Sequence, residues 1–247
     1  MSISSLKSSD VFAVLGLSVS VFVLAGPLLA GLGVAGLVLT QIVAFALPAL
    51  LVAATRDEGW QAIGWKPSPS LTLIAAAGIG CSIWAWNSMW IAPIGEDWAS
   101  PEQMEALVEV FAVHKRHIIL NLLAFALVPA VCEELLHRGV IAPALARRLG
   151  FVPGLVLSSL LFGLFHLNLA RLLPTTVLGL ATGFVRLRSG SLAPAILLHF
   201  LYNACLLVAS EADLVLSTPI ALASVGSTTI FVFLAHKSLI SKDNADS

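Results

Sequence analysis

The chain has 247 residues, of which 58% are hydrophobic and 11% are charged, and its mean hydropathy is +0.97. Soluble domains contain about 45–50% apolar and about 25% charged residues, so this composition excludes an ordinary soluble domain. It predicts a protein whose main solvent is the lipid bilayer. The formal net charge of −1, without basic clusters interleaved with aromatic residues, excludes a nucleic-acid-binding protein.

Eight apolar segments follow one another along the chain, close to the roughly 20 residues that a membrane-spanning helix needs. They cover residues 11–29, 32–54, 71–92, 117–138, 152–168, 172–187, 191–209 and 217–236. Clusters of Gly, Pro and charged residues separate them, and the chain has no internal repeat. We therefore predict an all-α, polytopic membrane protein with about eight transmembrane helices in one bundle. The first segment is expected to be a retained helix rather than a cleaved signal peptide.

The basic residues predict how these helices are oriented, because cytoplasmic loops are enriched in Lys and Arg. With the N-terminus inside, ten of the thirteen basic residues fall at inner positions: Lys7, Arg56, Lys66, Arg138, Arg147, Arg148, Arg186, Arg188, Lys237 and Lys242. The other three, Lys115, Arg116 and Arg171, fall in outer loops. We predict an integral protein of a bacterial inner membrane with both termini in the cytoplasm.

Two further features of the sequence carry structural expectations. The three cysteines, Cys81, Cys132 and Cys205, lie within apolar segments at spacings that match no metal-binding motif. We expect them to be buried small hydrophobic residues. Residues 101–113 have the pattern of a short amphipathic helix, with Ser100 as its N-cap and Pro101 at its first position.

Few ionisable or amide side chains lie inside the apolar segments. An ionised side chain at the centre of a membrane helix costs at least about 2.5–3.5 kcal/mol, so each one is by default a candidate functional residue. The group comprises Glu133, Glu134, His137 and Arg138 in the fourth segment, His166 in the fifth, and His199 and Asn203 in the seventh.

The spacing of the charged residues separates the two carboxylates. Glu134 and Arg138 stand at i and i+4 with the acid first, the favourable order for an ion pair within one helix. Glu133 is rotated by about 100° from Glu134 and can therefore face a cavity. Two neighbouring carboxylates in different environments are suited to provide one structural acid and one base. His137 is expected to be a bystander near the inner membrane boundary.

The other polar residues show the same interval of four. His199 and Asn203 project from one helix face, and Phe162 is placed to pack against His166 and fix its rotamer. If the fourth and fifth segments form a hairpin that turns at Gly150, Glu133 and His166 lie at similar depth. His199 is expected to be shallower.

These residue types are suited to hydrolysis. A carboxylate can take a proton from water as a general base, while histidine and amide groups donate hydrogen bonds to the developing oxyanion. The same carboxylate and imidazoles could instead ligate zinc, although the HExxH motif is absent. The chain has no GxSxG sequence, which disfavours a serine hydrolase.

Three short motifs carry a family resemblance. EELLHR (133–138), FGLFH (162–166) and HFLYN (199–203) match the patterns EExxxR, FxxxH and HxxxN. In this order, in successive membrane helices, they resemble the CAAX-protease and bacteriocin-processing family of intramembrane proteases, which includes the type II CAAX prenyl endopeptidase-like and Abi proteins. Eukaryotic members remove the last three residues of prenylated proteins. The resemblance covers about residues 117–209 and assigns no motif to the N-terminal third.

The resemblance implies a role for each matching position. Glu133 would activate water, His166 would help to hold that water, and His199 with Asn203 would form the oxyanion side. The remaining motif residues would support the site, and they are Glu134, Arg138 and Phe162.

It also implies a division of the chain and a choice of cofactor. Residues 117–209 would be the catalytic core, between N-terminal helices in 1–116 and a last helix and tail in 210–247, all within one structural domain. We expect no metal, and the alternative is Zn²⁺ held by Glu133, His166 and His199.

The expected partners are the lipid bilayer and a membrane-associated protein or peptide substrate. Two other functions remain open. Membrane helices also use Asn and His to bind one another, which would suit a catalytically inert scaffold or immunity protein. Acids and histidines within the membrane also occur in transporters and proton relays, but the chain has no matching halves of the kind that transporters show.

Overall fold

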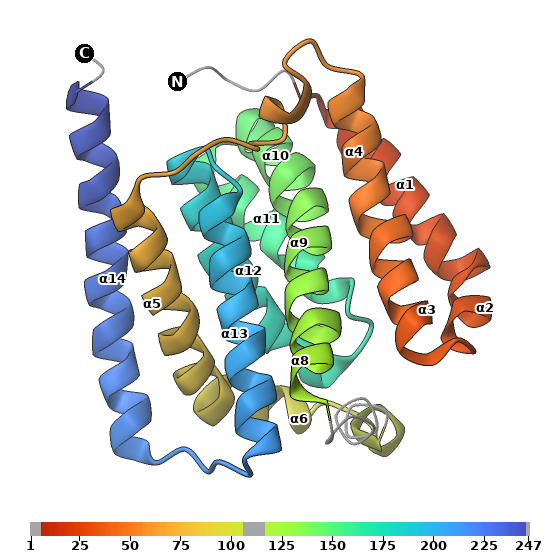
Figure 1. Cartoon of the computed structure of the whole chain (residues 1–247), viewed down its shortest axis with the longest axis vertical. Helices are drawn as coiled ribbons and strands as arrows, with labels where there is room; N and C mark the ends of the chain where they lie inside the picture. The colour runs from red at the N-terminus through yellow and green to blue at the C-terminus, as the bar shows by residue number, and fades with distance from the viewer. Residues whose placement is uncertain (1–5, 106–116, 246–247) are drawn as a thin grey trace.

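The computed structural model describes residues 6–105 and 117–245, and every regular element in these two ranges is a helix (Figure 1). The predicted all-α class is therefore confirmed. The N-terminal part contains α1 (Ser8–Leu24), α2 (Gly26–Ala30), α3 (Gly33–Thr40), the π-helical η1 (Gln41–Ala46), α4 (Leu47–Ala54) and the 3-10 turn η2 (Gly59–Gln61).

The middle of the chain forms two long helices, each made of several consecutive segments. The first contains α5 (Ser70–Trp86), η3 (Asn87–Ile91) and α6 (Ala92–Glu96). The second contains α8 (Ile118–Asn121), η4 (Leu122–Leu127), α9 (Val128–Glu134), η5 (Leu135–Ile141) and α10 (Ala142–Leu149). Four single helices follow, and they are α11 (Phe151–Leu164), α12 (Leu169–Ser189), α13 (Ala193–Glu211) and α14 (Thr218–Ala245).

Proline explains where the long helices widen into π-helical turns. Pro48, Pro93, Pro129 and Pro143 each stand in the first turn of an α-helix that directly follows a π-helical segment. Proline lacks the N–H group of a regular helical bond and its ring crowds the preceding turn, so the helix accommodates it by widening. The helix that carries Glu133 thus continues past Pro143 to Leu149.

Glycine ends two of these helices at sharp turns. Gly150 has a φ of 93° and joins α10 to α11, as the predicted hairpin requires. Gly190 has a φ of 67° and closes α12. Positive φ values of this kind favour glycine because it has no Cβ atom.

The chain is an integral membrane protein. Within the described ranges, five helical stretches are long and apolar enough to cross a bilayer: Gly33–Ala54, Ser70–Glu96, Ile118–Leu149, Ala193–Glu211 and Thr218–Ala235. Ser9–Leu24 and Phe151–Leu164 are shorter apolar helices, and α12 has 21 residues. The count of about eight spanning helices stays a prediction, which these lengths allow.

The loops predicted to lie on the inner side meet at one end of the bundle, at the top of Figure 1. There Arg56 pairs with Asp10, Ser191 Oγ donates to the Lys66 carbonyl at 2.6 Å, and Leu192 N–H donates to the Gly64 carbonyl at 2.9 Å. The cytoplasmic assignment of this end remains a prediction. Lys115 and Arg116, predicted at the other end, lie outside the described residues.

Three expectations need correction or completion here. Arg138, counted above among the basic residues at inner positions, does not lie in a loop: it is in η5 and is 1% exposed inside the bundle. Cys132 is buried as expected, but Cys81 is exposed and Cys205 is only partly buried. Pro101 begins a helix as predicted, and the Ser100 hydroxyl accepts from the Gln103 N–H at 3.3 Å. Residues 106–113 of the predicted amphipathic helix lie outside the described ranges.

Candidate active site

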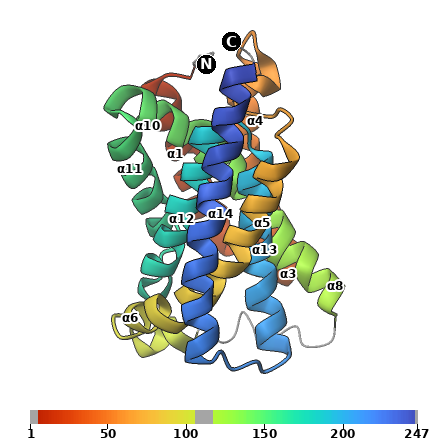
Figure 2. The same ribbon diagram turned by 90° about the vertical axis from the view of Figure 1, so that its left-hand side faces the viewer.

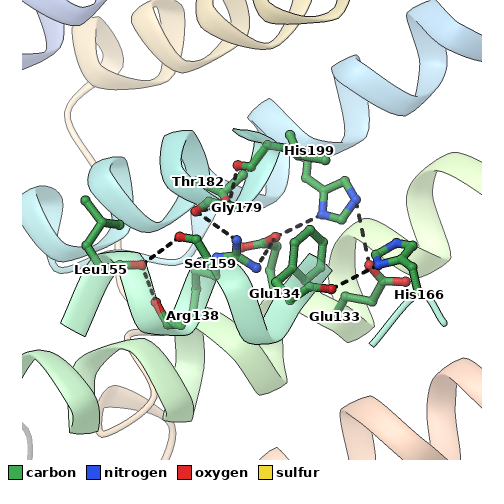
Figure 3. A network of polar contacts seen from close by, with 12 residues as sticks. Glu133, Glu134, Arg138, Leu155, Ser159, His166, Gly179, Thr182 and His199 are labelled. Carbon is green, nitrogen blue, oxygen red and sulfur yellow. Dashed lines mark hydrogen bonds and ion pairs between the residues drawn. The ribbon is translucent and has the colours of Figure 1, made fainter. Parts of the chain in front are cut away.

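The two neighbouring glutamates end α9, in the most enclosed part of the bundle. Every residue from 132 to 142 is buried. The π-helical segments η4 and η5 flank α9, and such segments are frequent at functional sites. Figure 3 shows that Glu133 and Glu134 point toward side chains from other helices rather than along their own.

Glu134 and Arg138 form the predicted internal pair. Arg138 Nη1 lies 3.3 Å from Glu134 Oε1, and the side chains are 1% and 0% exposed. Arg138 also donates from Nη2 to the Gly179 carbonyl of α12 at 2.9 Å, and its guanidinium lies over the Phe162 ring at 4.3 Å. The pair therefore fastens α9 to α11 and α12.

His199 lies between the two glutamates, which the spacing did not predict. Its Nδ1 is 2.9 Å from Glu134 Oε1, and its Nε2 is 3.9 Å from Glu133 Oε2. A carboxylate oxygen that also faces Arg138 is an acceptor, so Nδ1 carries the hydrogen of this bond. His199 Nε2 is thereby directed toward Glu133.

Glu133 faces away from the pair, as predicted. Its Oε1 accepts a hydrogen bond from Gln41 Nε2 at 2.9 Å, and its Oε2 has no hydrogen-bond partner among the described residues. The residue is 6% exposed and borders a cavity. Each carboxylate thus has one oxygen without a hydrogen-bond partner among the described residues, but only Glu133 lines the cavity.

The predicted contact between Phe162 and His166 is present. Their ring centroids are 5.1 Å apart in an edge-to-face arrangement, and His166 Nδ1 lies 3.0 Å from the Phe162 carbonyl. A carbonyl only accepts, so His166 Nδ1 is the donor and the neutral ring keeps Nε2 as an acceptor. The same phenylalanine ring lies 5.7 Å from the ring of His199. Phe162 therefore positions both histidines.

Glu133 and His166 border one common cavity of about 770 Å³ between the helices. Five of the seven defined positions of the three motifs line it: Glu133, Phe162, His166, His199 and Asn203. Glu134 and Arg138 are absent from its wall, as their supporting role predicts. Apolar side chains form much of the rest, and they include Phe22, Leu37, Phe45, Phe125, Phe165, Leu178 and Leu206.

His137 is not the bystander that we expected. It is fully buried, lines the cavity, and lies 5.0 Å from the ring of Phe162 and 5.3 Å from that of Phe165. Neither ring nitrogen has a hydrogen-bond partner among the described residues. Its i,i+4 spacing from Glu133 was the available signal, because that spacing places both on one helix face.

Two cavity residues come from parts of the chain to which the motifs drew no attention. Gln41 lies at the start of η1 in the N-terminal part, where it is one polar residue in a long apolar segment. Arg171, expected in an outer loop, lies in the first turn of α12 and lines the cavity with an exposed side chain.

The choice between a metal-free site and the alternative zinc site stays a prediction. Within residues 6–105 and 117–245, no group of three or more His, Cys, Asp or Glu side chains is arranged to hold a metal ion. Glu133, His166 and His199 border one cavity but do not converge as three ligands would.

Comparison with known proteins addresses the identity of this site. Residues 115–205 match the Rce1-like family model, described as Type II CAAX prenyl endopeptidase Rce1-like. The match confirms the resemblance to CAAX proteases. The matched residues include all three motifs and exclude the helices α1 to α6. No curated protein and no solved structure matches the chain.

Proposed function

We propose that the chain hydrolyses a peptide bond in a membrane-associated protein or peptide, with water activated by Glu133. The observation that carries this proposal is the Oε2 of Glu133 at the cavity, which has no hydrogen-bond partner in the described part of the chain and lies 3.9 Å from His199 Nε2. A buried polar atom of this kind calls for a partner such as water or substrate. The family match, which names a group of endopeptidases, supports the same reaction class.

The first step is proton transfer from water. A water molecule held between Glu133 and His166 gives its proton to the Glu133 carboxylate and attacks the peptide carbonyl carbon. His166 donates from Nδ1 to the Phe162 carbonyl, so its Nε2 accepts the second hydrogen of that water. The edge-to-face packing of Phe162 keeps this imidazole in place.

The second step develops negative charge on the carbonyl oxygen. His199 in its doubly protonated form donates from Nδ1 to Glu134 and from Nε2 to this oxygen, and the Asn203 amide one turn later donates as well. When the C–N bond breaks, Glu133 returns its proton to the leaving nitrogen. Glu134 and Arg138 hold His199 in the required orientation.

The test compares membranes from cells that produce the wild-type chain or Glu133→Gln. We would identify membrane-bound and released peptides by mass spectrometry at equal accumulation of the two proteins. We expect new peptide ends with the wild type and a loss of at least about 1,000-fold with Glu133→Gln, because the general base and the water it activates are removed.

The control is Asp57→Asn, which makes the same carboxylate-to-amide change in an exposed loop. It should give the wild-type peptides. Identical peptide sets from Glu133→Gln and wild type would overturn the proposal and favour the inert scaffold. Metal analysis of the purified active protein decides the cofactor: activity without bound zinc is expected, and stoichiometric zinc required for turnover would contradict this.

A further inference from the structure

Gln41 makes the only side-chain hydrogen bond to Glu133 that the described residues provide. Its Nε2 donates to Glu133 Oε1 at 2.9 Å, across 92 residues of sequence. Because a carboxylate only accepts, the amide nitrogen must face it, which determines the orientation of the Gln41 side chain. Gln41 itself lines the cavity.

The bond leaves the two oxygens of Glu133 in different states. Oε1 is held by Gln41, while Oε2 has no hydrogen-bond partner among residues 6–105 and 117–245 and lies on the side of His199. Without the amide, the Glu133 side chain could rotate and present either oxygen, in several orientations, to the cavity. A general base is effective only when its accepting oxygen is kept in reach of the proton.

The backbone around Gln41 places its side-chain amide next to Glu133. Gln41 is the first residue of η1, the π-helical turn ahead of Pro48, and η1 packs against α9. Pro48 explains the wide turn, and the wide turn places a polar side chain of an otherwise apolar helix next to Glu133. The donor thus comes from outside the segment 115–205 that matches the protease family.

We infer that Gln41 is a positioning residue, which holds the Glu133 carboxylate so that its Oε2 is directed at the reacting water. This inference rests on the proposed function. It makes the N-terminal helices part of the active site, rather than only a membrane anchor for the core.

The experiment uses Gln41→Met in the full chain, since methionine keeps the unbranched shape and removes the donor. The substrate is a synthetic peptide whose cleavage distinguishes wild type from Glu133→Gln. We expect kcat to fall about 10–100-fold with KM within about 2-fold, because a mispositioned base weakens the chemical step and not binding.

Thr40→Val is the matched control. The Thr40 hydroxyl donates to the Gly36 carbonyl of its own helix at 2.8 Å and does not contact Glu133. This variant should keep the wild-type kcat and KM. A wild-type kcat in Gln41→Met, or an effect confined to KM, would overturn the inference.

A second measurement needs no substrate. Gln41→Met and Glu133→Met, alone and together, are compared by thermal unfolding in detergent. Each single change leaves a buried polar group without its partner, so the double variant should lose less Tm than the sum of the two. Strictly additive shifts would contradict the bond. If Glu133→Gln cleaves normally, the proposed function fails, whereas normal Gln41→Met with inactive Glu133→Gln removes only this inference.

Discussion

The helical stretch Ile118–Leu149 and the last helix α14 are both apolar enough to span a membrane. They differ in where their polar side chains find hydrogen-bond partners. In the first, the residues from 132 to 142 are buried, and its charged side chains contact residues from α12, α13 and η1. In α14, large apolar side chains are exposed, and Phe233 reaches 64%. Within residues 132–142, charge is therefore placed where other helices surround it.

The polar residues of α14 show the alternative solution. The hydroxyls of Ser227, Thr228 and Thr229 donate to carbonyls four residues earlier in the same helix. Such bonds need no partner helix, so they are tolerated on a lipid-facing surface. α14 lies alongside α5 in both views (Figures 1 and 2), and at Gly78 of α5 a Cβ atom would come within 2.4 Å of the Phe231 ring. The packing of α14 against α5 therefore depends on the close approach of the two helices and not on ion pairs between their described residues.

The largest stability effect should come from breaking the enclosed pair. Arg138→Met leaves Glu134 buried and short of one partner, and it removes the bond to the Gly179 carbonyl. Removing one member of a buried pair costs about 3–5 kcal/mol, so we expect a loss of this size in the free energy of unfolding. Reversible unfolding in detergent, followed by circular dichroism, measures it.

Arg188→Met is the matched control, because Arg188 also lies over aromatic rings but has an exposed side chain. It should cost less than about 1 kcal/mol, since exposed cation–π contacts are worth about 0.5–1 kcal/mol. Equal losses in the two variants would show that enclosure of Arg138 does not matter.

Local spacing accounts for the parts of this site that the sequence predicted. Glu134 with Arg138, and Phe162 with His166, are neighbours on one turn, so helical geometry alone brings them together. The turn at Gly150 followed from its position between two apolar segments. The three motifs then identified which helices face the cavity.

Contacts between segments far apart in the sequence could not be predicted from local spacing. Nothing in the apolar sequence around Gln41 indicates that η1 packs against α9, and the bond to Glu133 spans 92 residues. The position of His199 between both glutamates depends likewise on the rotation of α13 about its axis. The misplacement of His137 was different, because its spacing from Glu133 already placed it on the cavity side.

A smaller effect, of opposite sign, is expected at His137. Its ring is enclosed by Phe45, Phe162 and Phe165, and both nitrogens lack partners among the described residues. His137→Phe removes this unpaired polar group and keeps an aromatic ring, so the free energy of unfolding should rise by about 1 kcal/mol. A loss of stability, accompanied by loss of cleavage, would instead show that the imidazole bonds to a polar group in the cavity.

The smallest effect should come from the exposed face of α14. Thr229 donates to the Val225 carbonyl at 3.1 Å and its side chain is exposed, so Thr229→Val removes a bond within the helix and leaves no buried group unpaired. We expect a change in the free energy of unfolding below about 0.5 kcal/mol and unchanged cleavage. The same detergent unfolding measurement applies. A loss comparable to that of Arg138→Met would mean that another helix or a second protein covers this face, and the contrast between α14 and the enclosed helix would no longer hold.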